Sequence, residues 1–126
     1  MLKHTKAFSG FSVNNLEKAK EFYSKVLGLT VKDHPMGLLE LHIAGNNPII
    51  VYPKPDHTPA SFTILNFPVD NIDQTVDMLT QQGVAFEQYD GTIRTDKKGI
   101  NRNSGGPQIA WFKDPAGNIF SVIQSN

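Results

Sequence analysis

Glu40 and His42 are the side chains whose types and spacing most directly suggest chemistry. They stand two residues apart in an alternating stretch, 38–44, and therefore project from one face of the predicted strand. A carboxylate and an imidazole on one face are ligands for a divalent metal ion, but such a site needs at least one more. We favour the alternative, a polar row that faces solvent opposite the leucines of the same strand.

Trp111, Arg94 and Arg102 each allow two interpretations. Trp111, the only tryptophan, either packs in a core, which is favoured, or forms a stacking wall for a planar or cationic ligand. Arg94 and Arg102 flank a polar loop and either belong to the ordinary charged surface or hold a carboxylate or phosphate with a bidentate guanidinium. The other histidines are expected to be solvated, namely His4, His34 and His57, although His57 is the third ligand in a metal alternative with Glu40 and His42.

The composition excludes several classes of protein. Lys+Arg and Asp+Glu are 12 each, so no field of one sign attracts nucleic acid or an anionic membrane. Cysteine is absent, which excludes disulfides, thiolate metal sites and a cysteine nucleophile. The 126 residues, 39% of them hydrophobic, suit a single domain and contain no apolar stretch long enough for a signal peptide or a membrane span. A cytoplasmic location is the default expectation.

The elements that must position these residues occur twice, because residues 8–26 align with residues 64–82. Each copy opens with a predicted strand, 7–13 and 61–69, followed by an amphipathic helix. Asn14 or Asn15 is the predicted N-cap of the first helix and Asp70 that of the second. Gly28 and Gly83 supply the positive φ that ends each helix.

Three predicted strands follow each helix. They are 29–32, 38–44 and 49–52 in the first half, and 85–89, 109–113 and 119–124 in the second. Residues 90–107 are predicted to be mostly loop. The sequence thus predicts an α+β fold of two βαβββ modules, about 5–53 and about 61–126, joined by a proline-rich linker at about 54–60.

Two segments carry a resemblance to a known family. The helix region VNNLEKAKEFYSKVLGL, residues 13–29, and the hairpin WFKDPAGNIFSVI, residues 111–123, resemble the vicinal oxygen chelate superfamily, which includes glyoxalase I, extradiol dioxygenases, and fosfomycin- and bleomycin-resistance proteins. The resemblance covers nearly the whole chain and implies one domain, 1–126. It further implies that the two mixed sheets form a half-open barrel with the helices outside and a pocket between the modules.

The resemblance also implies where a metal would be held. Enzymes of the superfamily use up to four His or Glu side chains, on the first and last strands of each module. The matching positions here are Phe8, Val51, Ile64 and Ser121, which offer a cation three hydrocarbons and one hydroxyl. No metal and no other cofactor is therefore expected. By strand parity, all four face away from the helix-side core, and the pocket is expected to be lined by these four and by Gly10, Ile49, Phe62, Asn66, Trp111, Ile119 and Ile123.

Together these observations predict a glyoxalase-like or bleomycin-resistance-like protein that binds a small, largely apolar or aromatic molecule between the modules. One alternative is a metal-dependent lyase, isomerase or dioxygenase that uses relocated ligands such as Glu40 and His42. A second is an interaction module whose pocket is filled by its own side chains. Members of the superfamily often pair, so a homodimer is expected; the sequence leaves open which molecule is bound and whether any reaction is catalysed.

Overall fold

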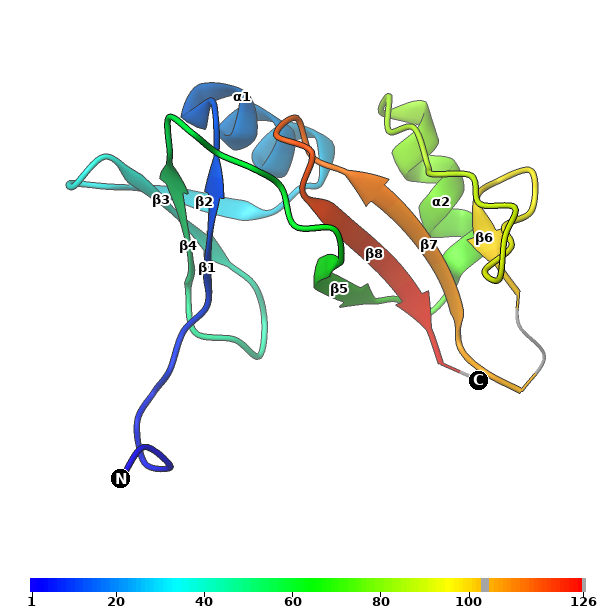
Figure 1. Ribbon diagram of the computed structural model, residues 1–126, viewed down its shortest axis with the longest axis horizontal. Coiled ribbons are helices and arrows are strands. Elements are labelled where there is room, and N and C mark those ends of the chain that lie inside the picture. Colours follow the sequence, from blue (N-terminus) through cyan, green and yellow to red (C-terminus); the bar gives the residue numbers. More distant parts are fainter. Residues whose placement is uncertain (103–104, 126) are drawn as a thin grey trace. The chain divides into compact units, whose positions relative to one another are not determined.

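The computed structural model describes residues 1–102 and 105–125 of the chain. It consists of two compact units, Met1–Thr58 and Pro59–Asn126 (Figure 1). Within the described residues no helix is both long and apolar enough to cross a membrane. In the described part of the chain each unit has one helical segment and one four-stranded sheet, which confirms the α+β class and the twofold βαβββ order.

The first unit contains four strands in the order β1-β4-β3-β2. Its elements are β1 (Gly10–Val13), α1 (Leu16–Glu21) continued by a π-helical turn (Phe22–Val26), β2 (Thr30–His34), β3 (Leu38–His42) and β4 (Ile49–Pro53). The first and last strands, β1 and β4, are parallel, and the other pairs are antiparallel.

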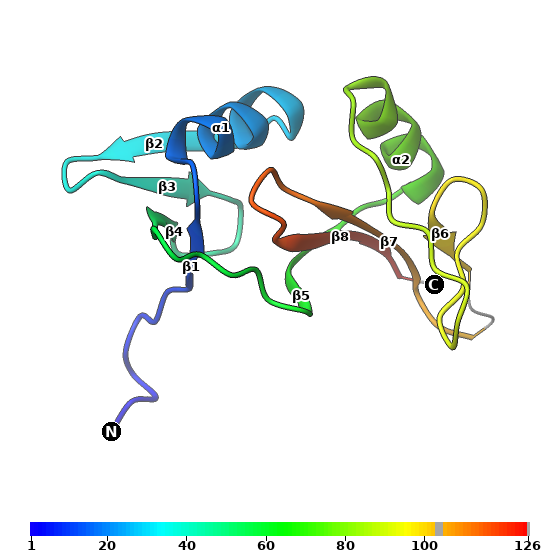
Figure 2. The same ribbon diagram turned by 45° about the horizontal axis from the view of Figure 1, so that its top comes forward.

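The second unit repeats this arrangement with the strand order β5-β8-β7-β6. Its elements are β5 (Thr63–Pro68), α2 (Ile72–Gln81), β6 (Ile100–Asn101), β7 (Gln108–Lys113) and β8 (Ile119–Gln124). Again the first and last strands are parallel. α2 packs on β7 and β8, as Figure 2 shows, so one face of this sheet carries the helix.

Both helices begin at an asparagine. The side chains of Asn15 and Asn71 accept hydrogen bonds from the backbone N–H groups of Lys18 and Gln74, which satisfies one of the free donors of each first turn. The expected Asn15 cap is confirmed, whereas Asp70 is not the cap of the second helix. The true caps are equivalent positions of the repeat, because Asn71 aligns with Asn15.

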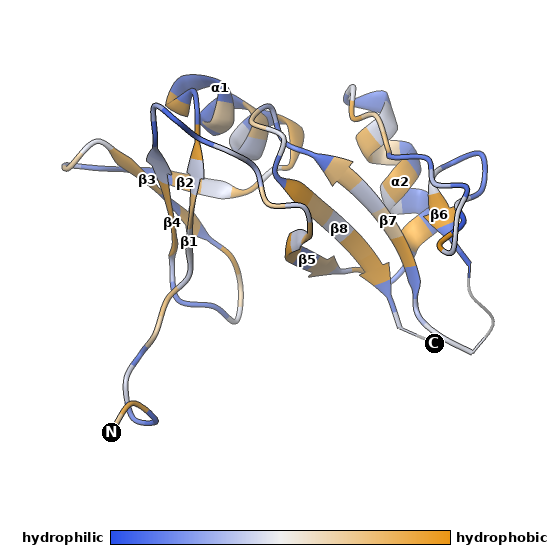
Figure 3. Cartoon of the chain, in the orientation of Figure 1, coloured by the Kyte–Doolittle hydropathy of each residue, from blue (hydrophilic) through white to orange (hydrophobic). Residues whose placement is uncertain are grey.

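The core of each unit lies between its helix and its sheet. In the first unit, Tyr23 is fully buried and its ring meets that of Phe11 edge to face at 6.3 Å. In the second, the rings of Phe112 and Phe120 are 5.7 Å apart beneath α2. Apolar colour therefore concentrates along β8 and on one side of α2 (Figure 3). Such burial is the main favourable term in folding.

Two segments of the second unit differ from the expected strands. Residues 85–89 form no strand: Phe86 makes a single antiparallel bridge to Phe112. The strand beside β7 is instead β6, which lies in the segment 90–107 that was expected to be loop and pairs with Ile109 and Ala110. The two segments thus share one edge of β7, and neither occupies its full length. Residues 103 and 104 of that expected loop, and Asn126, lie outside the described residues.

Candidate functional site

Each sheet has one face that carries a helix and one that does not, here called the helix-free face. In the first unit, Val51 pairs with Phe11 and with Leu39. Partners in register project from the same face, and Phe11 contacts Tyr23 of the helical segment, so Val51 lies in the helix-side core. Ile49 pairs with Leu41 in the same way and is also buried. The expectation that Val51 and Ile49 line the helix-free face is therefore wrong.

The register identifies the residue that does occupy the expected position. Ser121 pairs with Asn66 on the two parallel strands of the second unit, and Ile50 pairs with Gly10 on those of the first. Because Gly10 aligns with Asn66 in the repeat, Ile50 is the counterpart of Ser121. Matching the two last strands by sequence alone placed them one residue out of register, which exchanges the two faces of a strand.

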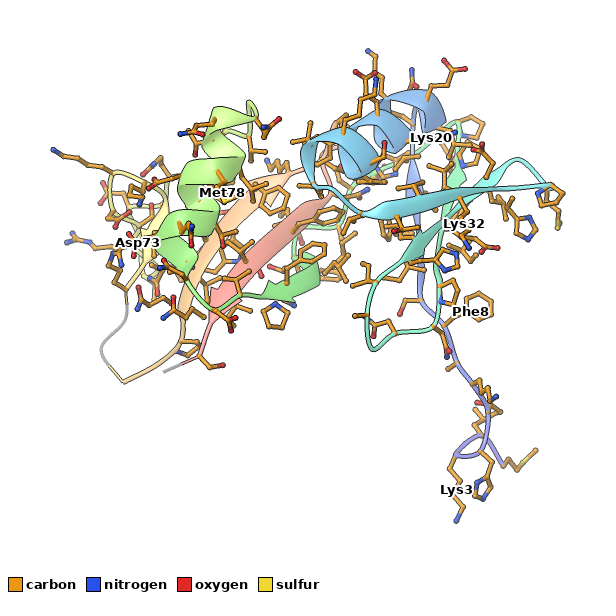
Figure 4. All side chains as sticks on the ribbon, turned by 180° about the vertical axis from the view of Figure 1, so that it is seen from behind. Lys3, Phe8, Lys20, Lys32, Asp73 and Met78 are labelled. Carbon is orange, nitrogen blue, oxygen red and sulfur yellow. The ribbon has the colours of Figure 1, made fainter. Side chains whose placement is uncertain are left out.

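A shallow hollow lies beside Ile50 on the first unit. It has a volume of about 310 Å³ and is lined by Lys6, Phe8, Glu40, Asn47, Pro48 and Ile50. Phe8 precedes β1 rather than lying in it, is 67% exposed, and projects from the N-terminal segment in Figure 4. This hollow contains Phe8, one of the residues expected to bind a ligand, and its polar side chains are Lys6, Glu40 and Asn47.

Glu40 is held between two histidines. Its Oε1 lies 3.0 Å from Nε2 of His42, and its Oε2 lies 3.8 Å from Nε2 of His34. The strand alternation that puts Glu40 and His42 opposite buried Leu39 and Leu41 is confirmed. His34 joins them because it lies on the neighbouring strand β2, a proximity that sequence spacing did not reveal. Within residues 1–102 and 105–125 no three His, Asp or Glu side chains are arranged to hold a metal ion.

His57 is not a solvated linker residue. Its Nδ1 lies 2.6 Å from the hydroxyl oxygen of Ser12 on β1, and both side chains are partly buried. The contact joins residues far apart in the sequence and attaches the end of the first unit to its own sheet.

The second unit has a polar and aromatic row on its helix-free face. Asn66, Ser121 and Trp111 are register partners across β5, β8 and β7. The Ser121 hydroxyl donates to Oδ1 of Asn66 at 2.5 Å. We call these three residues the Asn66 row. Ile119 and Ile123 flank Ser121 on the same strand and face.

Trp111 is half-buried and lies outside the core beneath α2, so the favoured expectation that it packs in a core is wrong. Its Nε1–H donates to the Thr63 hydroxyl oxygen at 3.1 Å, and the Tyr89 ring meets it edge to face at 5.5 Å. Neither Thr63 nor Tyr89 was singled out from the sequence, because only the fold brings them to the tryptophan. Of the remaining expected residues, Phe62 is 67% exposed just before β5, and Ile64 falls in an irregularity of the β5–β8 pairing.

Arg102 is already engaged by acidic side chains. Its Nη2 and Nη1 lie 2.6 and 3.1 Å from the two carboxylate oxygens of Asp73, and its Nε lies 2.8 Å from Asp96. Asp73 stands in the first turn of α2, at the place labelled in Figure 4. The Arg102 guanidinium, which was considered as a binder of a carboxylate or phosphate, therefore joins α2 to the β6 segment. Arg94 is 80% exposed, with Asp90 4.0 Å away.

Hydrogen bonds from Arg102 and then Lys98 lower the pKa of Asp73 from its ordinary value of 3.8 to about 2. A lowered folded-state pKa stabilises the fold above the ordinary value, and this contribution is lost as the pH falls through about 2. The Asp73 side chain is 49% exposed, so screening limits the contribution to about 1 kcal/mol.

We therefore expect Asp73→Asn to lower the free energy of unfolding by about 1 kcal/mol at pH 7 and to flatten its decline between pH 4 and pH 2. Urea unfolding across this range measures both effects. Asp70→Asn is the matched control, because Asp70 forms no ion pair in the described part of the chain. An unchanged acid profile in Asp73→Asn would show that the ion pairs contribute nothing to stability.

A model of the Glyoxalase/Bleomycin resistance protein/Dioxygenase superfamily matches residues 2–122. The chain belongs to this superfamily. No curated protein sequence matches it. The antibiotic-binding protein TnmS3 from Streptomyces sp. CB03234 is 25% identical, with a TM-score of 0.73 over 100% of this chain and 99% of that one.

More distant structures share the fold. A superfamily member from Sphaerobacter thermophilus DSM 20745 is 20% identical, with a TM-score of 0.74 over 99% of this chain and 100% of that one. The fosfomycin resistance protein FosX from Listeria monocytogenes is 13% identical, with a TM-score of 0.74 over 100% of this chain and 96% of that one.

The residues present do not fit the metal that superfamily enzymes carry. With Ile50 in place of Val51, the four positions implied by the resemblance are Phe8, Ile50, Ile64 and Ser121. Hydrocarbon side chains cannot replace the hydration shell of a divalent cation, and one hydroxyl is too few. Three hydrocarbon side chains and one hydroxyl are therefore a poor donor set for such a cation.

Proposed function

We propose that the protein binds a small, largely apolar or aromatic molecule and that the helix-free face of the second unit holds it. The observation that carries this proposal is the placement of Trp111. The Trp111 ring lies at the helix-free face, and the Tyr89 ring meets it edge to face. The Asn66–Ser121 hydrogen bond lies beside it, so this face combines apolar area with a few polar groups. This combination is typical of small-molecule sites.

Similarity to a protein of known binding function supports the same proposal. The antibiotic-binding protein TnmS3 matches this chain along its full length at 25% identity. Binding alone requires no metal, which suits the donor-poor positions described above. An aromatic natural product or antibiotic is accordingly the kind of ligand we propose. A homodimer also remains a proposal, and sedimentation at micromolar concentration tests it.

The competing function is metal-dependent catalysis through Glu40 and His42. These two side chains face each other at 3.0 Å. Metal analysis of protein purified without a histidine tag separates the two functions. If wild type contains stoichiometric Zn, Ni, Mn or Fe and the Glu40→Ala and His42→Ala variants lose it, the protein is a metal-dependent enzyme and our proposal is wrong.

For the proposed binding function, we expect a thermal-shift screen of planar aromatic compounds to yield ligands that raise the melting temperature, because a ligand that binds only the folded state stabilises it. For such a ligand, Trp111→Ala should weaken binding about tenfold or more, since an aromatic contact and its buried area are lost. Trp111→Phe, which retains a ring, should weaken it less. Calorimetric titration measures all three affinities.

Tyr52→Ala is the control for this experiment. Tyr52 is an exposed aromatic residue of the first unit, 38% accessible, and lies outside the proposed site. Its removal should leave the affinity unchanged. Equal affinities in wild type and a folded Trp111→Ala variant would show that the ligand binds elsewhere.

A further inference from the structure

The hydrogen bonds of the Asn66 row determine which polar groups are left for a ligand. Ser121 uses its hydroxyl hydrogen on Asn66 Oδ1, and Trp111 uses its N–H on Thr63. Among the described residues, the amide nitrogen of Asn66 has no hydrogen-bond partner, and Asn66 is exposed. An amide nitrogen carries two donors and no acceptor. The row therefore offers a ligand hydrogen-bond donors, held in orientation by Ser121.

The charges on this sheet favour a neutral ligand. The one charged residue in strands β5 to β8 is Lys113. Its Nζ lies 3.5 Å from a carboxylate oxygen of Glu87. The backbone N–H of Glu87 donates to the backbone carbonyl oxygen of Trp111. The pair largely cancels its own field, so neither a cation nor an anion would find an uncompensated partner there.

The register sets the length of the ligand. Asn66 and Trp111 flank Ser121 on the two strands adjacent to β8. Neighbouring strands are about 5 Å apart, so the Cα atoms of Asn66 and Trp111 lie on the order of 10 Å apart across the sheet. Two fused aromatic rings that carry a carbonyl at one end match this span, with the rings at Trp111 and the carbonyl oxygen at Asn66.

We infer that the second unit selects neutral, planar aromatic ketones of two or three fused rings, with Asn66 Nδ2 donating to the ketone oxygen and Trp111 contacting the rings. This inference rests on the proposed binding function and names its ligand class. Asn66 is then the residue that distinguishes a ketone from a hydrocarbon of the same shape.

The test compares 2-acetylnaphthalene with 2-ethylnaphthalene, which differ only in the carbonyl group. Equilibrium dialysis against wild type should give about five- to tenfold tighter binding of the ketone, the usual net effect of one hydrogen bond. Asn66→Asp retains the oxygen that accepts from Ser121 but removes both N–H donors. This variant should bind the two compounds within twofold of each other, and its affinity for 2-ethylnaphthalene should stay within twofold of wild type.

Asn66→Leu removes the whole amide and provides a second variant if Asn66→Asp does not fold. Equal binding of both naphthalenes to wild type would overturn the inference and leave the proposed function standing. A ketone preference that persists in both folded variants would also overturn it, because another residue would then be the donor. If neither compound binds wild type up to its solubility limit, the inference is wrong, and aromatic molecules are no longer the ligands of the proposed function.

Discussion

Phe112→Ala is expected to lower the free energy of unfolding by about 3–5 kcal/mol, the usual cost of removing a fully buried phenylalanine. Phe112 is 1% exposed and stands between two other rings, Phe86 at 5.6 Å and Phe120 at 5.7 Å. Its loss leaves a cavity between β7, α2 and the 85–89 segment that these rings cannot fill. Urea unfolding followed by far-ultraviolet circular dichroism measures the change.

Phe62→Ala is the matched control for this prediction. It is the same substitution at a residue that is 67% exposed, so the change should stay within about 0.5 kcal/mol. If Phe112→Ala lowered the free energy of unfolding as little as is expected for Phe62→Ala, Phe112 would not be part of the core of the second unit.

Gly99→Ala is expected to cost about 2–4 kcal/mol, through a clash rather than a cavity. A Cβ atom at this position would lie 2.6 Å from Cβ of Phe86 and 3.3 Å from the carbonyl oxygen of Glu87. Both atoms are fixed to the backbone and cannot swing aside. The backbone φ of +90° adds strain, because side-chain-bearing residues rarely adopt it. Thermal and urea unfolding measure the loss.

Gly91→Ala is the control for Gly99→Ala. Nothing lies within 4 Å of a Cβ at Gly91, and its φ is not positive, so this substitution should be neutral or stabilising by a few tenths of a kcal/mol. The Gly99 clash acts on Phe86, which packs against Phe112. The Gly99→Ala/Phe112→Ala double variant should therefore be less destabilised than the sum of the single variants. Strict additivity would show that the clash is relieved without moving the Phe86 ring.

Local patterns predicted the helices and most strands. The apolar spacing, the capping asparagine at residue 15 and the glycines at residues 28 and 83 act over a few residues. The structure bears them out, with φ of +70° and +97° at the two glycines. Strand β8 (Ile119–Gln124) was also predicted with its observed bounds. Such features depend on interactions between near neighbours, which a single sequence displays.

The register of β4 and the contacts of the candidate site depend on distant residues. The run Ile49, Ile50 and Val51 is apolar at every position, so no alternation shows which residues face the helix, and the prediction chose the wrong face for Val51 and Ile49. Tyr89 reaches Trp111, and Ser12 reaches His57, only after the sheets have formed. The Asp73–Arg102 ion pair likewise joins α2 to the β6 segment. Pairings of this kind leave no periodic signal in one chain.

The parallel partnership of the first and last strand of each unit governs the order in which the chain can assemble during synthesis. β1 pairs with β4, so completing the first sheet requires the chain only as far as Pro53. β5 must wait for β8, whose last residue is Gln124. Until β8 is present, Trp111 lacks the strand that places Asn66 beside it, so the Asn66 row forms only when the second sheet is complete.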